Sequence, residues 1–184
     1  MMADDPGASE AGLVARARNG DALAFGQLIE RHYDFIFRLA WRWCGDRTDA
    51  EDIAQEVCVR LGSAIRGFRG TAAFTTWLYT LTLNVVRDTA RKRASEAAKV
   101  KAMGVQTQID GEAGESADDR GEMLWEAVRA LPEKQRDAVL LVYGEGLSHS
   151  AAADVMGISE ATVSWHVHEA KKRLKVLMRQ AEEV

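Results

Sequence analysis

Apolar residues recur every three or four positions along most of the chain, which is the period of a helix with one buried face. In the first half, this pattern predicts helices over residues 25–43, over residues 49–61 and from about Ala72 onward. Polar breaks at residues 46–49 and 66–70 separate them, with Thr48 or Asp49 able to cap the second helix. The three helices are expected to pack as one domain.

Residues 94–121 break the helical pattern, because they hold no Phe, Trp or Tyr. The acidic residues of this stretch gather in its second half: Asp110, Glu112, Glu115, Asp118 and Asp119. Such a segment cannot bury enough apolar surface to order itself, and it is predicted to be a flexible linker. The predicted organisation is a disordered N-terminus (1–9), a helical domain (10–93), the linker (94–121) and a second helical domain (122–184).

The second domain carries the pattern of a helix-turn-helix. An alanine-rich helix over residues 150–156 is expected to end at Gly157, because glycine readily takes the left-handed conformation that closes helices. Ser159 is placed to cap the next helix. That helix has one apolar stripe, made of Val163, Val167, Ala170, Leu174 and Leu177. The predicted fold class is all-α, with two small helical domains joined by a flexible linker and a helix-turn-helix in the C-terminal one.

The face opposite that stripe carries large polar and basic side chains. At about 100° per residue it holds Trp165, His168, Glu169 and Lys172. Lys171 and Lys175 lie on one flank of this face. A short helix with donors and acceptors on its outer face suits the major groove of DNA, where base edges offer complementary groups. The alternative is a helical hairpin that only packs against the rest of its domain.

Composition narrows the possible classes of protein. The 184-residue chain has a formal net charge of −4. Its pI is near 5.6, so any contact with DNA must come from local basic patches. There is no run of about 18 apolar residues, and the acidic N-terminus lacks the features of a signal peptide. A cytoplasmic protein without membrane insertion is expected.

Neither a cofactor nor a metal is expected from the sequence. Cys44 and Cys58 have no CxxC partner, which favours free thiols. His166 and His168 are two positions apart, which separates them by about 200° around a helix. The chain also has no Gly-rich phosphate loop, nucleophile motif or plausible catalytic triad, so an enzyme is the weakest class.

Four segments in order resemble the extracytoplasmic-function (ECF) group of bacterial RNA polymerase sigma factors. They are DAEDIAQEV, FRGTAAFTTWLYTLTLNVVRDTARKR, ALPEKQRDAVLLVYGEGLS and the helix-turn-helix. The resemblance covers nearly the whole chain and implies two domains, sigma region 2 and sigma region 4. It also implies an alternative sigma factor that binds core RNA polymerase and directs promoter recognition and transcription initiation for a stress-responsive or signal-responsive gene set. Such a protein joins the nucleoid when bound to polymerase, and the family is usually held inactive by an anti-sigma factor.

The resemblance assigns roles to individual residues of the first domain. The acidic helix of region 2 docks on core polymerase, and its polar contacts fall here on Asp52, Gln55 and Glu56. The residues matching those that bind the −10 promoter element are Phe68, Arg69, Asn84, Arg87, Asp88 and Arg91. Trp77 is instead expected in the core, because its spacing with Leu78 and Leu81 follows the apolar stripe.

In region 4, the residues expected to bind the −35 element are Ser164, Trp165, His168, Glu169, Lys171, Lys172 and Lys175. This chain departs from the family here, since members commonly carry arginines where it has Ser164, His166 and Glu169. A carboxylate at Glu169 would face phosphates unless it accepts a hydrogen bond from cytosine N4. Either the −35 preference differs from that of common members, or the affinity for the −35 element is low.

Two other functions stay open at this point. A sigma-like decoy would bind an anti-sigma factor without binding DNA; the outward Glu169 and the missing arginines favour it. The basic run over residues 171–175 and the intact face of Asp52, Gln55 and Glu56 argue against a decoy. A plain helix-turn-helix repressor or activator would not need the first domain at all.

Overall fold

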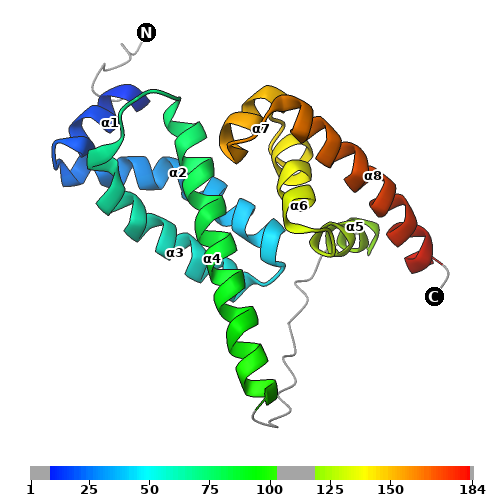
Figure 1. Cartoon of the computed structure of the whole chain (residues 1–184). Helices are drawn as coiled ribbons and strands as arrows, with labels where there is room; N and C mark the ends of the chain where they lie inside the picture. Colours follow the sequence, from blue (N-terminus) through cyan, green and yellow to red (C-terminus); the bar gives the residue numbers. More distant parts are fainter. Residues whose placement is uncertain (1–8, 103–118, 183–184) are drawn as a thin grey trace.

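The computed structural model describes residues 9–102 and 119–182, which are almost entirely helical and contain no strand (Figure 1). The first domain consists of α1 (Glu10–Arg18), α2 (Ala22–Cys44), α3 (Arg47–Ala64), a 3-10 turn η1 (Ile65–Gly67) and α4 (Phe74–Ala102). The second consists of α5 (Asp119–Arg129), α6 (Glu133–Val139), a π-helical turn η2 (Leu140–Gly144), α7 (His149–Met156) and α8 (Glu160–Glu182). None of the helices in these ranges is long and apolar enough to span a membrane. The predicted all-α fold class is confirmed.

The boundary between α2 and α3 is set by two adjacent residues. Gly45 ends α2 in the left-handed conformation, with φ of 80°. Asp46 then caps α3, and its carboxylate accepts the backbone N–H of Asp49 at 2.7 Å. The expected caps, Thr48 and Asp49, were wrong, because the helix begins two residues earlier at Arg47 and both lie inside its first turn.

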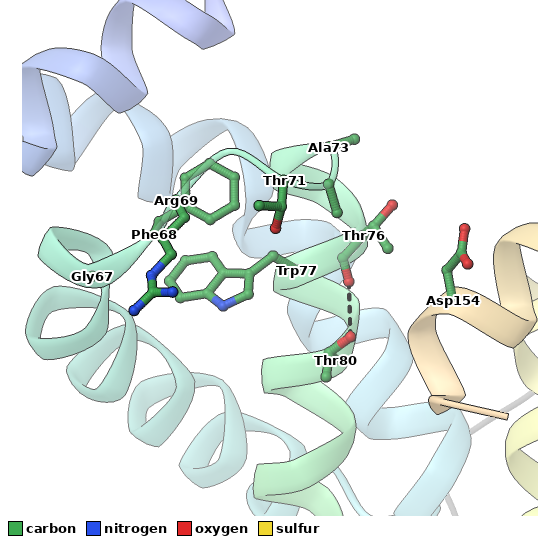
Figure 2. A pocket seen from close by; sticks show the side chains of 10 residues that line it. Gly67, Phe68, Arg69, Thr71, Ala73, Thr76, Trp77, Thr80 and Asp154 are labelled. Atoms are coloured by element: carbon green, nitrogen blue, oxygen red, sulfur yellow. Dashed lines mark hydrogen bonds between the residues drawn. The ribbon is translucent and has the colours of Figure 1, made fainter.

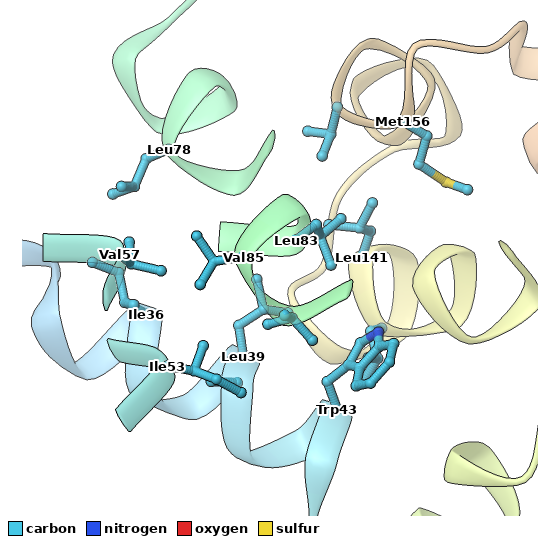
Figure 3. Packing of buried hydrophobic residues seen from close by; sticks show 14 of the residues in the cluster. Ile36, Leu39, Trp43, Ile53, Val57, Leu78, Leu83, Val85, Leu141 and Met156 are labelled. Atoms are coloured by element: carbon cyan, nitrogen blue, oxygen red, sulfur yellow. The ribbon is translucent and has the colours of Figure 1, made fainter. Parts of the chain in front are cut away.

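The first domain is built around the apolar faces of α2, α3 and α4. Leu39 of α2, Val57 of α3 and Leu78 of α4 are completely inaccessible to solvent, and Figure 3 shows their side chains converging. The short α1 packs on α2 through Leu13 and Val14. This packing fixes which faces of α3 and α4 are left for partners.

The helix-turn-helix forms as the sequence indicates. Gly157 ends α7 with φ of 64°, and Ser159 accepts the backbone N–H of Thr162 at 3.1 Å at the start of α8. Val163, Val167 and Ala170 of the predicted stripe are buried. Leu174 and Leu177 further along α8 are only half-buried, because the end of the helix extends past the domain.

The two domains lie in contact, and their buried side chains form one continuous cluster. α7 packs against α4, while α5 and η2 pack against α2. Figure 3 shows Leu83 of α4 and Leu141 of η2 on facing sides of this seam, with Met156 of α7 nearby. A polar contact joins the same helices, where the hydroxyl of Thr80 donates to the Val155 carbonyl at 3.2 Å. The described conformation is therefore closed.

The predicted linker differs from the structure at both ends. Residues 94–102 continue α4, and α5 begins at Asp119. The sequence of 94–102, ASEAAKVKA, is rich in strong helix formers, so the helix continues although the side chains of residues 94–100 are exposed. The absence of aromatic residues was thus a poor basis for predicting that residues 94–102 belong to a flexible linker. The acidic residues Asp110, Glu112, Glu115 and Asp118 lie outside the described residues.

Two glycines of α2 provide a paired stability test. Gly45→Ala should destabilise the protein by about 1–2 kcal/mol, because alanine is strained in the left-handed conformation. Its new Cβ would also lie 2.6 Å from Nε of Arg129 in the second domain. Gly26→Ala should stabilise it by about 0.5–1 kcal/mol, since Gly26 lies inside the helix with open space around a Cβ. Urea denaturation of the full chain measures both changes, and equal effects of the two substitutions would contradict this assignment.

Candidate polymerase and nucleic-acid interfaces

The outer face of α3 presents the polar residues that the sequence singled out for docking. Asp52 and Gln55 are exposed, whereas Glu56 is half-buried. Glu56 accepts a hydrogen bond from Nε of Arg60 at 2.7 Å, and Arg60 also donates to Asp88 of α4 at 2.9 Å. Asp88 and Glu56 together raise the pKa of Arg60. Glu56 and Asp88 thus belong to one ion-pair network that joins α3 to α4.

An apolar residue interrupts this acidic face. Val59 is 66% exposed, one turn after Gln55 and beside Arg60 on the same helix. A single exposed valine needs no explanation by itself. Here it gives the polar α3 face an apolar contact point.

The loop after η1 carries two residues that were predicted to bind the −10 element, one buried and one exposed. Phe68 is 9% exposed, and its ring lies 5.0 Å from that of Trp77 and 5.8 Å from that of Phe74, measured between centroids. Arg69 is exposed. Phe68 is therefore part of the aromatic cluster below the loop, and its ring is less open to a partner than the sequence assignment implied.

Above this aromatic cluster lies an open cavity of about 720 Å³. Its lining comes from the loop and the start of α4: Gly67, Phe68, Arg69, Thr71, Ala72, Ala73, Thr76, Trp77 and Thr80. Trp77, expected in the core, is only half-buried and forms part of the wall. Figure 2 shows the Trp77 ring tilted against that of Phe68, with Arg69 close by. Aromatic faces, hydroxyls and one guanidinium in a cavity of this size suit an unstacked base and its phosphate.

The second domain also contributes to this cavity. Asp154 of α7 is exposed and completes the lining on the side of Thr76 and Thr80 (Figure 2). A carboxylate at this position adds negative charge to a site whose other charged side chain is Arg69. The sequence analysis did not single out Asp154, because it lies more than 70 positions from Thr80 in the chain.

The remaining predicted −10 residues of α4 point in different directions. Asn84 is exposed. The Arg87 side chain is only 13% exposed and forms an ion pair with Asp137 of α6, whose side chain is completely buried. Arg91 lies 3.2 Å from a carboxylate oxygen of Glu133. Arg87 and Arg91 are thus turned toward the second domain.

Asp137 is the centre of this interdomain contact. One of its oxygens accepts Nε of Arg87 at 2.9 Å, and the other accepts the indole N–H of Trp43 at 2.9 Å. Burial raises the pKa of Asp137, while the Arg87 guanidinium and the Trp43 donor act in the opposite direction. No local pattern connects residues 43, 87 and 137, so the sequence analysis missed this triad.

The outer face of α8 is close to the sequence prediction. Trp165 is 56% exposed. His168, Lys171, Lys172 and Lys175 are also exposed. Lys171 lies over the ring of Tyr143, with Nζ 4.9 Å from the ring centroid. This surface is cationic and carries one large aromatic side chain.

Two residues of this face have partners that limit their freedom. Ser164 is half-buried, and its hydroxyl lies 2.7 Å from Nδ1 of His149 at the start of α7. Glu169 is half-buried and accepts Nζ of Lys172 at 2.9 Å, a hydrogen bond that lowers the pKa of Glu169. Glu169 is therefore partly neutralised by its neighbour on the same helix, one turn away. In the described ranges, no group of His, Cys, Asp and Glu could hold a metal ion.

Comparisons with known proteins match each domain to a known family. Sigma-70 region 2 matches residues 28–96. Sigma-70, region 4, matches residues 121–174. The RNA polymerase sigma-H factor of Pseudomonas aeruginosa is 33% identical, with 92% of this chain and 95% of that protein covered. The ECF RNA polymerase sigma factor SigW of Bacillus subtilis is 29% identical, with 90% and 95% covered.

Two solved structures share the fold. CnrH in complex with the cytosolic domain of CnrY has a TM-score of 0.66 and 27% identity, over 91% of this chain and 96% of that one. The sigma factor RpoE of Bartonella quintana, solved with the anti-sigma factor NepR, has a TM-score of 0.68. Its identity is 22%, over 84% of this chain and 96% of that one, so this second likeness bears on the fold alone.

Proposed function

Because this chain belongs to the ECF group of the sigma-70 family of RNA polymerase sigma factors, we propose that it binds core RNA polymerase and directs it to promoters. The single observation that carries the proposal is the cavity of about 720 Å³ beside the loop after η1. A pocket for an unstacked base is needed by a protein that opens a promoter, whereas a repressor that binds intact duplex has no use for one. The cavity therefore favours an initiation factor over a plain helix-turn-helix regulator.

The polymerase contact is assigned to the outer face of α3. Asp52 and Gln55 are exposed there, Glu56 lies beside them, and Val59 adds apolar area. Protein interfaces gain affinity from a desolvated apolar centre with polar groups around it. This arrangement supports docking through Asp52, Gln55 and Glu56.

The −10 contact is assigned to the cavity and the exposed side of α4. Arg69 and Asn84 are exposed and can reach the phosphates and base edges of a separated strand. Phe68 packs against Trp77 below these two residues, so it contributes by shaping the cavity. Arg87 and Arg91 are ion-paired with the second domain in the closed conformation and become available when the domains separate, whereas Asp88 is paired with Arg60 within the first domain.

The −35 contact is assigned to α8 in the major groove. Ser164, Trp165, His168 and Glu169 occupy the first half of the helix, which is the part that reaches base edges in helix-turn-helix proteins. Lys171, Lys172 and Lys175 follow and suit the phosphates. One solved relative at 27% identity, CnrH, is described as a complex with the cytosolic domain of CnrY, which supports a further protein partner; the family resemblance implies that this partner is an anti-sigma factor.

The members of this family are transcription regulators. In the proposed role this chain positions polymerase on DNA, and the chemistry of RNA synthesis belongs to the polymerase.

A decoy that binds only an anti-sigma factor remains the second candidate. The observation that favours it is Glu169, a carboxylate placed on the face that would enter the groove.

Core binding should depend on the α3 face. Replacing Gln55 and Glu56 together by alanine should weaken binding to core polymerase at least tenfold, because hot-spot residues each contribute about 2 kcal/mol or more. Glu51→Ala is the matched control, since Glu51 lies on the same helix and pairs with Arg47. Pull-down with purified core polymerase measures the effect. An unchanged pull-down for the double variant would remove the α3 face from the docking site.

The sequence preference at the −35 element should depend on Glu169. Glu169→Arg removes the pairing with Lys172 and should change the preferred −35 sequence by about 1–3 kcal/mol at one base pair. Lys175→Ala should instead weaken binding to all sequences and lower the log–log salt slope by about one unit. Selection from randomised −35 duplexes tests Glu169→Arg, and binding to one duplex at several salt concentrations tests Lys175→Ala, with Lys99→Ala at the far end of α4 as the control for both. Identical preferred sequences for the parent and Glu169→Arg would support the decoy.

A further inference from the structure

A second cavity, of about 270 Å³, lies where α2, α3 and α4 of the first domain meet α5 and α6 of the second. It shares no lining residue with the cavity beside the loop after η1. Three of the residues that line it are arginines, Arg93, Arg129 and Arg136, and one, Asp49, is a carboxylate. The charged lining is therefore cationic, although the whole chain has a formal net charge of −4.

Arg136 brings an unsatisfied donor to this second cavity. Its Nε atom is buried and has no hydrogen-bond partner among the described residues. Another nitrogen of the guanidinium donates to the Leu131 carbonyl at 3.1 Å, and the guanidinium carbon lies 4.2 Å from the centroid of the Trp43 ring. A buried charged donor without an acceptor is costly, so an anion that accepts from Nε would be stabilised there.

Arg129 occupies space that a glycine leaves open. A Cβ on Gly45, at the turn between α2 and α3, would lie 2.6 Å from Nε of Arg129. The Arg129 guanidinium also donates to Glu122 at 3.0 Å. Burial lowers the pKa of Arg136, the charge of Arg129 lowers it further, and two carboxylates of α6 act in the opposite direction. Two guanidiniums held this near to each other repel, and an anion shared between them offsets the repulsion.

The third arginine has a carboxylate partner within the lining. Arg93 of α4 forms an ion pair with Asp49 of α3. The two side chains are 45% and 24% exposed, and ion pairs in contact with solvent are weak enough to be exchanged for a stronger partner. Asp49 is thus the group that competes with any anion approaching Arg93.

We propose that this second cavity binds a compact phosphorylated ligand with two adjacent phosphates, either pyrophosphate itself or the diphosphate of a nucleotide. Guanidiniums recognise phosphate oxygens through paired N–H donors, and here three of them reach one cavity from three different helices. None of the lining residues is assigned above to polymerase, the −10 element or the −35 element, so this site does not rest on the proposed function.

The size and setting of the cavity favour a small ligand over a nucleic-acid backbone. Ligand pockets in proteins range over about 300–1,000 Å³, and this cavity lies near the lower end. A chain with net negative charge does not collect anions over its whole surface, so its attraction for phosphate must come from a local cluster such as this one. Trp43, 7% exposed, adds an apolar wall beside the three charges.

Substitutions at the lining should change anion affinity in opposite directions. Arg129→Gln and Arg136→Gln should each weaken pyrophosphate binding at least about tenfold, because each removes a charge-assisted donor. Asp49→Asn should strengthen binding about three- to tenfold, since it frees Arg93 and removes the competing carboxylate. Arg18→Gln is the matched control, because Arg18 is an exposed arginine of α1 outside the lining.

Isothermal titration calorimetry of the full chain, in a low-salt buffer free of phosphate, measures these affinities. The titrants are pyrophosphate, inorganic phosphate and ADP, and a random-sequence DNA duplex is titrated separately. Circular dichroism checks that each variant keeps its helices, and thermal unfolding with and without pyrophosphate gives a second readout, because a ligand that binds the folded chain raises its midpoint.

The expected result is saturable 1:1 binding of pyrophosphate, weaker binding of phosphate, and opposite changes for the arginine variants and Asp49→Asn. Tighter binding of ADP than of pyrophosphate assigns the diphosphate to a nucleotide, and the reverse assigns it to the free anion; both support the site. Absent or non-saturating binding of all three anions overturns it, as do equal losses for Arg18→Gln and Arg136→Gln. Weaker or unchanged binding by a folded Asp49→Asn chain overturns the role of Arg93. Equal losses of duplex and pyrophosphate binding in the arginine variants assign these arginines to a DNA surface and overturn the small-ligand site.

Discussion

The closed structure depends on the burial of one carboxylate, that of Asp137. A buried charge is tolerated only when it is paired and hydrogen-bonded, and here both partners, Trp43 and Arg87, come from the other domain. The pair also fixes the rotation of α4, because Arg87 must face α6 while Asn84, about one turn earlier, remains exposed. Arg42 reinforces the same seam by donating to the Gly144 carbonyl at 2.6 Å and to Glu145 at 2.7 Å. Separation of the domains exposes all of these groups together.

Periodicity was sufficient to predict the helices because their apolar faces are long and regular. The stripe of Val163, Val167 and Ala170 is buried as expected, and Gly157 ends α7 as its residue type indicates. The pairing of Glu169 with Lys172 could also have been read from the sequence, since three-residue spacing places side chains on the same face of a helix. The position of a regular apolar stripe and of a glycine that ends a helix is therefore accessible to sequence reasoning, whereas the cap of α3, Asp46, was missed.

Two of the missed features come from contacts between distant segments. Phe68 was assigned to DNA by its place in a family motif, but its ring packs on Trp77. Asp137 looked like one more polar residue of a helix, and only the docking of α6 on α2 and α4 buries it. The extension of α4 to Ala102 was missed because the aromatic content of residues 94–102 was weighed above their helix propensity. Such errors are to be expected for a protein that binds DNA through two surfaces. Its Arg and Lys side chains can form ion pairs within the chain when no DNA is bound.

This chain is proposed to direct core polymerase to promoters and to help to open them. The most direct measurement is in vitro transcription from a genomic promoter library, with purified core polymerase in the presence and absence of the chain. Transcripts should appear only with the chain and should start downstream of a shared pair of sequence elements, with thymines near the start site becoming reactive to permanganate. Binding to core polymerase without any such transcripts would rule out an initiation factor and leave the decoy as the better description.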